Sequence, residues 1–131
     1  MKLENDRLFV EIAEAGAEVT RIYDRNRGAD LLWEADPKYW KRHSPVLFPN
    51  VGKTYRNTVL IDGTQYPTSQ HGFARDSRFT CVCETEKKVS FLLSSSEETR
   101  EVYPYSFELV VTYTLEEACL NVEWEVHNTG S

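Results

Sequence analysis

Apolar and polar residues alternate along most of this chain with the period of two that is typical of β-strands with one buried face. The clearest cases lie in the second half, where residues 106–115 place apolar side chains at odd positions and residues 118–126 place them at even positions. Two further strands are predicted over 79–84 and 89–94. We therefore predict that the second half folds as a half-buried antiparallel sheet.

Shorter alternating segments occupy the first half. Strands are predicted over 8–12 and 18–23, and a third over 30–33, and together they suggest a β-meander. A hairpin is predicted over 58–66, because Asp62–Gly63 is a pair that favours the positive φ angles of a two-residue turn.

The region between these segments is the least strand-like. Pro37 suits the first position of a short helical turn, and we expect Tyr39 and Trp40 to fold from that turn onto the core. The apolar run 45–49 is closed by prolines, so it is predicted to be a buried edge or a loop rather than a central strand.

The length of 131 residues fits one domain with a single core, so we expect residues 1–131 to form one all-β antiparallel sandwich. The last strand runs into the turn-like sequence 127–131 without a returning partner, which leaves an unpaired sheet edge. Such an edge favours self-association with another chain. The other interpretation is that the chain is a piece of a longer protein.

Composition narrows the classes of function. The formal net charge is −6 and no dense cluster of Lys and Arg occurs, so nucleic acid is not an expected partner. No apolar run approaches the ~20 residues that span a bilayer, and the N-terminus lacks the apolar region of a signal peptide. We therefore expect no membrane partner and a cytoplasmic location. The three cysteines have no metal-type spacing, so no metal site is expected.

The densest group of chemically competent side chains lies at 70–76. His71 stands beside Gly72 in a predicted loop, where its ring is accessible and the backbone can approach a ligand. Arg75 offers a planar set of donors, and Asp76 can orient it or accept a hydrogen bond from a hydroxyl group. On these local features alone, a structural loop is the more common explanation of the same residues.

A second group could line a polar pocket, namely His43, Asn50 and Lys53, although an Asn before a glycine is also ordinary turn chemistry. His127 falls on the polar side of its strand, where a surface position explains it. The sequence contains no motif of a serine nucleophile, a zinc-binding helix or a phosphate-binding glycine loop.

An ordered series of segments covers essentially the whole chain: Glu14–Val19, Leu31–Trp33, Tyr39–Trp40, Ser44–Lys53, Tyr66–Pro67, Gln70–Asp76, Tyr103–Phe107 and Val122–Gly130. Together they resemble the aldose 1-epimerase (galactose mutarotase-like) superfamily, specifically its bacterial mutarotase-related branch. The most specific pieces are Phe-Pro at 48–49 and His-Gly-Phe-Ala-Arg-Asp at 71–76.

The resemblance implies a large antiparallel supersandwich with a sugar site on a concave sheet face. It also implies that the α and β anomers of a free aldohexose are interconverted by acid–base ring opening, without a cofactor. His71 matches the first site histidine of the family, which binds the sugar near its ring oxygen and stabilises the charge that develops there.

The resemblance further implies that the substrate-binding residues are Asn50, Lys53, His71, Arg75 and Asp76. Lys53 lies near the position of a family arginine that contacts sugar hydroxyls, but an ammonium group lacks the planar fork of arginine.

The general-acid histidine and the glutamate base of the family lie beyond the part that this chain resembles, and His127 matches neither. The sequence therefore predicts the N-terminal portion of a longer mutarotase-like domain, without its acid–base pair. The alternatives are a non-catalytic carbohydrate-binding β-sandwich, or a β-domain whose edge pairs with another chain. The sugar, and whether it is phosphorylated, stay open.

Overall fold

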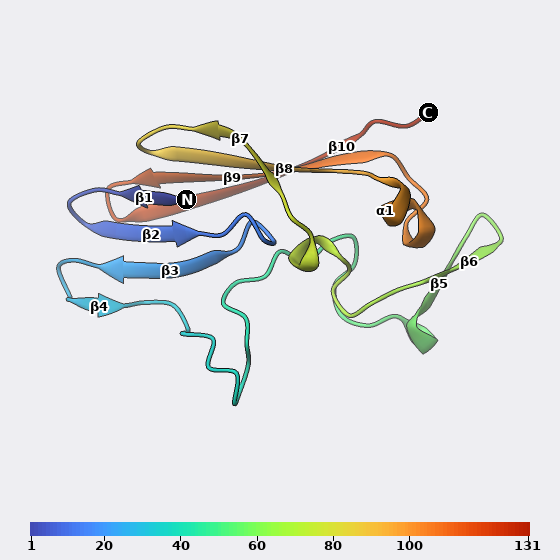
Figure 1. Ribbon diagram of the computed structural model, residues 1–131, viewed down its shortest axis with the longest axis horizontal. Coiled ribbons are helices and arrows are strands. Elements are labelled where there is room, and N and C mark those ends of the chain that lie inside the picture. The colour runs from blue at the N-terminus through green and yellow to red at the C-terminus, as the bar shows by residue number, and fades with distance from the viewer.

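The computed structural model describes residues 1–131 and consists of two four-stranded antiparallel sheets and a separate hairpin (Figure 1). The strands of the first sheet are β1 (Lys2–Glu4), β2 (Leu8–Ile12), β3 (Val19–Asp24) and β4 (Ala29–Asp30). Those of the second sheet are β7 (Thr80–Glu84), β8 (Lys88–Ser94), β9 (Phe107–Glu116) and β10 (Cys119–Asn128). The strand orders are β1-β2-β3-β4 and β10-β9-β8-β7, so the predicted all-β antiparallel class is confirmed.

One hydrophobic core joins the two sheets. The alternation predicted for 8–12 places Leu8, Val10 and Ile12 of β2 in this core, and the odd positions of β9 enter it from the second sheet. Because successive side chains of a strand point to opposite faces, each of these strands buries one complete face.

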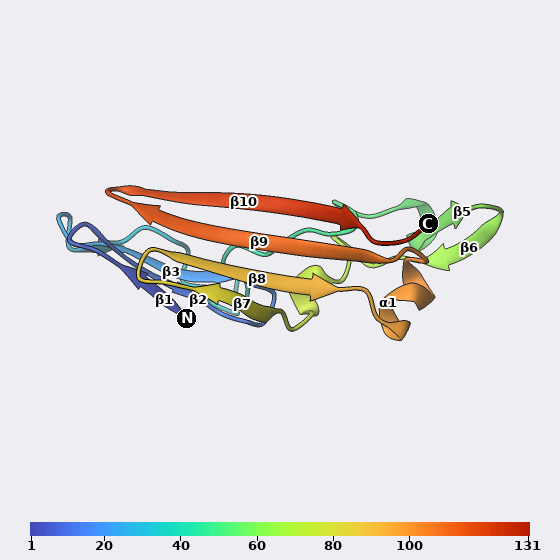
Figure 2. The same ribbon diagram turned by 90° about the horizontal axis from the view of Figure 1, so that it is seen from above.

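The buried face of the second sheet does not extend to its edge strand β10. Leu109, Val111 and Tyr113 of β9 are buried, whereas their partners across the ladder, Val126, Trp124 and Val122, are 56%, 50% and 48% exposed. In Figure 2, β10 forms the margin of the second sheet, beyond the strands of the first. The expectation of a half-buried strand at 118–126 is therefore wrong for this chain, because the covering sheet ends at β9.

The predicted hairpin is present as β5 (Thr58–Ile61) and β6 (Thr64–Pro67). Asp62 and Gly63 both have positive φ, at 47° and 79°, as a two-residue turn of this type requires. The hairpin lies away from the two sheets, beside the helix α1 (Glu97–Val102) (Figure 1). This short helix was not predicted; its signal is a capping box formed by Ser96 and Thr99.

Two expectations for the middle of the chain need correction. β4 ends at Asp30, so no strand continues over 31–33. The helical turn at Pro37 is present, since the N–H groups of Tyr39 and Trp40 both donate to the carbonyl oxygen of Asp36. The two aromatic side chains, however, are exposed rather than packed on the core. None of the helices has the length and apolar character needed to cross a membrane.

Candidate functional site

The loop that carries His71 is fixed by backbone hydrogen bonds to the segment before it. The carbonyl oxygen of Phe48 accepts the N–H groups of Phe73 at 3.0 Å and of Ala74 at 3.1 Å. Gly72 forms an isolated bridge with Phe48 in the same place. The short 3-10 helix η2 (Ala74–Asp76) begins directly afterwards and positions Arg75.

Gly72 allows this close approach. Its φ is +73°, and a Cβ at this position would lie 2.1 Å from the carbonyl oxygen of Phe48. Any side chain would therefore displace the backbone that fixes the His71 loop.

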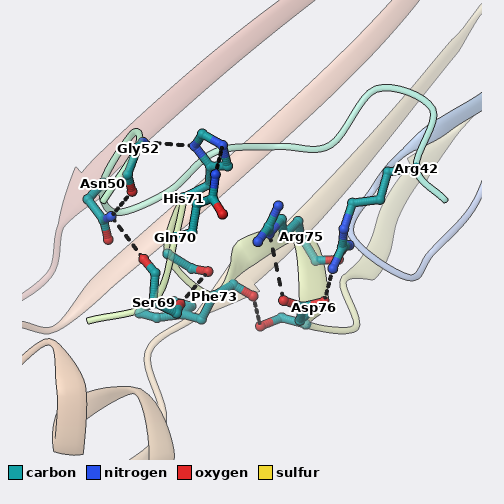
Figure 3. A network of polar contacts seen from close by, with 11 residues as sticks. Arg42, Asn50, Gly52, Ser69, Gln70, His71, Phe73, Arg75 and Asp76 are labelled. Carbon is teal, nitrogen blue, oxygen red and sulfur yellow. Dashed lines mark hydrogen bonds and ion pairs between the residues drawn. The ribbon is translucent and has the colours of Figure 1, made fainter. Parts of the chain in front are cut away.

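The imidazole ring of His71 is held by Gly52 in a defined tautomer. The N–H of Gly52 donates to Nδ1 of His71 at 2.8 Å, and the N–H of His71 donates to the carbonyl oxygen of Gly52 at 2.9 Å (Figure 3). Because Nδ1 acts as an acceptor, the proton of the neutral ring is on Nε2. Nε2 of His71 lies 3.4 Å from the amide nitrogen Nε2 of Gln70. Both nitrogens are donors in this tautomer, so Gln70 does not accept the ring N–H, which is available to a ligand.

His71 also has an unusual backbone conformation, with φ at +66°. Residues other than glycine in this left-handed region carry a cost of about 1–2 kcal/mol. Six other non-glycine residues of the chain also have positive φ, so this conformation describes the tight turn of the loop and does not by itself assign a function to His71.

His71 and Arg75 line the same cleft, whose volume is about 820 Å³. His43, Ser44 and Gln70 add polar groups to its wall. The apolar part comes from both sheets and the loop between them, and includes Ile22, Leu32, Trp40, Tyr113, Val122 and Trp124. The structure thus brings together two of the five predicted site residues with aromatic side chains that are far away in the sequence.

The guanidinium group of Arg75 has no hydrogen-bond partner within the chain. Its side chain is 17% exposed, its Nε is buried and unpaired, and the nearest anion is Oδ2 of Asp76 at 3.8 Å. Arg42 occupies the other carboxylate oxygen of Asp76 at 2.6 Å (Figure 3). The buried Nε is oriented toward Asp76, whereas the two terminal NH2 groups make no hydrogen bond within the chain and are available to a ligand in the cleft.

A buried carboxylate, that of Glu18, lies behind the part of the cleft wall formed by His43 and Ser44 and does not itself line the cleft. Oε1 of Glu18 accepts the backbone N–H groups of His43 at 2.5 Å and Ser44 at 3.0 Å, and lies 3.6 Å from Nδ1 of His43. Burial, and secondly the charge of Glu18, raises the pKa of Tyr113 well above its usual range. The Tyr113 hydroxyl donates to the carbonyl oxygen of Ala17 at 2.6 Å. The tyrosine therefore stays neutral at physiological pH.

The other predicted site residues lie elsewhere. The side-chain amide of Asn50 donates to the carbonyl oxygens of Gly52 and Ser69, both at 3.1 Å, and Asn50 lines a separate pocket of about 400 Å³. Lys53 is exposed and is not among the residues that line the 820 Å³ cleft. Asp76 is also outside this cleft and reaches it only through Arg75.

Sequence reasoning missed Trp40 and Trp124 as parts of the site. The alternation in 118–126 placed Trp124 on an apolar face, but nothing in the local sequence indicates that this face borders His71. The cleft now combines an N–H donor, a guanidinium group and aromatic surfaces, a combination that suits a ring with several hydroxyl groups. No three His, Cys, Asp or Glu side chains form a group that could hold a metal ion.

The whole chain, residues 1–131, matches the sequence profile of the family Aldose 1-epimerase. The chain belongs to this family, and its fold is that of the galactose mutarotase-like proteins.

Particular relatives agree with this assignment. Two forms of Protein LacX from Lactococcus lactis subsp. lactis, plasmid and chromosomal, are each 33% identical over 133 residues, covering 98% of this chain and 44% of the relative. Among solved structures, a galactose mutarotase related enzyme from Lactobacillus acidophilus is 37% identical with a TM-score of 0.97, covering 99% of this chain and 43% of that one. A galactose mutarotase-like protein from Lactobacillus casei ATCC 334 is 34% identical with a TM-score of 0.97, covering 100% and 45%. The chain therefore spans less than half the length of these relatives.

Proposed function

We propose that this chain supplies the sugar pocket of an aldose 1-epimerase-like isomerase that interconverts the α and β anomers of a free aldohexose. The observation that carries the proposal is the His71 ring, whose Nδ1 is occupied by Gly52 so that Nε2–H is a fixed donor at the cleft. Family membership makes a sugar the expected ligand of this cleft.

His71 is proposed to donate its Nε2–H to the ring oxygen of the sugar. When the bond between the anomeric carbon and the ring oxygen breaks, negative charge develops on that oxygen. A donor that is oriented before the reaction stabilises this charge without reorganisation. No cofactor takes part in this step.

Arg75 is proposed to bind sugar hydroxyls through its unpaired guanidinium group. Asp76 orients Arg75, since one of its oxygens is held by Arg42 and the other faces Nε of Arg75. Lys53 is proposed to contact the ligand only from the rim of the site.

We propose that the chain corresponds to the N-terminal portion of a longer sandwich domain. Two observations support this: the chain spans about 44% of its curated relatives, and the apolar face of β10 has no cover. The remaining portion would cover this face and supply the general-acid histidine and the glutamate base. The three free cysteines favour a cytoplasmic location, where thiols remain reduced.

A non-catalytic carbohydrate-binding β-sandwich is the second candidate. It is favoured by one observation, namely that no Asp or Glu is among the residues that line the cleft. A base that removes a proton from the anomeric hydroxyl is therefore missing from the cleft of this chain.

The test is NMR titration of the chain with galactose and with glucose, using His71→Asn and His127→Asn as a matched pair. Asn tolerates the left-handed backbone of position 71, and His127 is an exposed strand residue. We expect sugar-induced shifts in the wild type and the His127 variant, and a roughly tenfold weaker affinity in the His71 variant. Equal affinity in both variants would refute the role of His71.

The same samples test whether the acid–base pair lies within these 131 residues. If the chain lacks the acid–base pair, freshly dissolved α-galactose should equilibrate at the buffer rate in its presence. Faster equilibration would mean that these 131 residues contain a complete proton-transfer pair.

A further inference from the structure

Asn50 holds together the two segments that fix the His71 ring. Its side-chain Nδ2 is 3.1 Å from the carbonyl oxygen of Gly52 and 3.1 Å from that of Ser69 (Figure 3). Both hydrogens of the amide are thereby used within the chain. We propose that Asn50 is a positioning residue that acts through Gly52 to keep His71 in the Nε2–H tautomer.

Gly52 has little else to hold it in place. A Cβ at this position would meet no atom within 4 Å, and its neighbour Val51 is exposed. Beyond its contacts with His71, the Asn50 amide is the side chain that fixes this peptide. Because the N–H of Gly52 selects the tautomer of His71, a displacement of Gly52 removes the preference.

The loop on the other side of Asn50 is braced internally. The hydroxyl of Ser69 donates to the carbonyl oxygen of Gly72 at 2.9 Å, and the N–H of Gly72 donates to the carbonyl oxygen of Ser69 at 3.1 Å. Asn50 therefore connects a well-braced loop to a weakly held glycine.

The geometry also distinguishes this role from direct contact with the sugar. Asn50 lines the 400 Å³ pocket formed with Val59, Ile61 and Tyr103, and it does not line the cleft of His71. Its effect on a ligand in that cleft must pass through Gly52 and the ring. The consequence for sugar binding rests on the proposed function, whereas the effect on the tautomer does not.

The test is the tautomer of His71 in the absence of sugar, measured by long-range ¹H–¹⁵N correlation of uniformly ¹⁵N-labelled protein above pH 8. In the wild type we expect a through-hydrogen-bond coupling between the Gly52 nitrogen and Nδ1, and a single Nε2–H tautomer. Asn50→Ala and Asn50→Asp remove the donors, and Asn26→Asp, at an exposed turn residue, controls for the added charge.

We expect the tautomer ratio of His71 to fall roughly 2- to 10-fold in both Asn50 variants, as loss of one hydrogen bond implies, and to stay unchanged in the control. Exchange of the Gly52 amide hydrogen should rise in parallel. An Asn50→Ala protein with the wild-type tautomer ratio and Gly52 protection would overturn the proposal. Absence of the coupling in the wild type would overturn it as well, even if neither variant folds.

Sugar titration keeps this inference separate from the proposed function. A wild type that shows no sugar shifts, but whose tautomer depends on Asn50, retains the positioning role and loses the proposed ligand. A wild type that binds sugar, with an unaltered tautomer in Asn50→Ala, retains the ligand and loses the positioning role.

Discussion

β9 and β10 are adjacent ten-residue strands, paired along their whole length, and both alternate apolar and polar side chains. Their inward side chains lie directly opposite one another, so they share one face of the sheet. On β9 these side chains are fully buried, and on β10 about half of each side chain is exposed. The difference arises because the first sheet covers β9 and stops short of β10.

The contrast separates two properties that a sequence pattern combines. Alternation determines which face of a strand is apolar, since it depends only on the period of the strand. Burial of that face depends on whether another element lies over it, and that element need not belong to the same stretch of chain. The effect of a substitution on the free energy of unfolding should therefore depend more on whether another element covers the residue than on the residue type.

The strongest test compares Leu109→Ala with Val126→Ala across one rung of the ladder. Leu109 is buried, so its truncation should lower the free energy of unfolding by about 2–5 kcal/mol. Val126 is more than half exposed, and its truncation should change that free energy by less than about 0.5 kcal/mol. Urea unfolding of the two variants measures both values. A similar loss in both would mean that β10 is covered in solution.

Two glycines with φ near +75° differ in the same respect, namely whether other atoms lie against the position of an added Cβ. Gly72→Ala places a Cβ against the carbonyl of Phe48, whereas Gly63→Ala, in the β5–β6 turn, meets no atom within 4 Å. Both carry the left-handed cost of about 1–2 kcal/mol, and only Gly72 adds an overpacking cost of about 1–3 kcal/mol.

Thermal unfolding of the two alanine variants gives the difference. Loss of the His71–Gly52 coupling should accompany Gly72→Ala alone, because the substitution displaces the loop on which His71 stands. Equal destabilisation by the two substitutions would indicate that the backbone at Phe48 can shift to accommodate the added Cβ without loss of stability.

The parts of the fold that could be predicted from the sequence are those set by residues close together in the chain. The strands of the second sheet and the Asp62–Gly63 turn were predicted almost to the residue, because period and turn chemistry are local. The short strand β1 and the helix α1 were missed, since three and six residues are too few to show a period.

For the candidate site as well, only the part formed by one local segment was predicted. Residues 70–76 were identified from one compact segment, and the structure places His71 and Arg75 in one cleft. The exposure of Lys53 and the use of the Asn50 amide on backbone carbonyls could not be predicted, because both depend on how the segments before and after β5–β6 meet. Trp124 reaches the cleft only through sheet pairing.

The uncovered face of β10 should also promote self-association of the 131-residue chain. Trp124→Lys places a charge in the middle of this face, and we expect the dimerisation constant to weaken roughly tenfold. Tyr55→Lys is the control, since Tyr55 is also an exposed aromatic residue but lies outside the sheets. Sedimentation velocity over a range of concentrations distinguishes them. A monomeric wild type at high concentration would show that the edge is protected without a partner.

The smallest expected effect concerns two aspartates that differ in cover, Asp24 on β3 and Asp30 on β4. Burial acts to raise the pKa of Asp24, but the N–H groups of Asn26 and Arg27 and the nearby arginine charges outweigh it and hold the pKa below its usual value. The pKa of Asp30 is also lowered, chiefly by its hydrogen bond from Arg21.

In both cases the unfolded chain binds more protons than the folded chain between the two pKa values, so stability rises with pH across that window. The stabilisation is complete above the unfolded value of about 4 and is lost as the pH falls through the folded value. Asp24→Asn should therefore flatten the acid limb of the stability curve. Asp30→Asn should flatten it less, because its ion pair with Arg21 is half exposed and screened by salt. Unfolding of both variants between pH 2 and 6, at low and at high salt, measures the pH dependence of stability that each aspartate contributes. If salt weakened the contribution of Asp24 as much as that of Asp30, the carboxylate of Asp24 would be as open to solvent as that of Asp30.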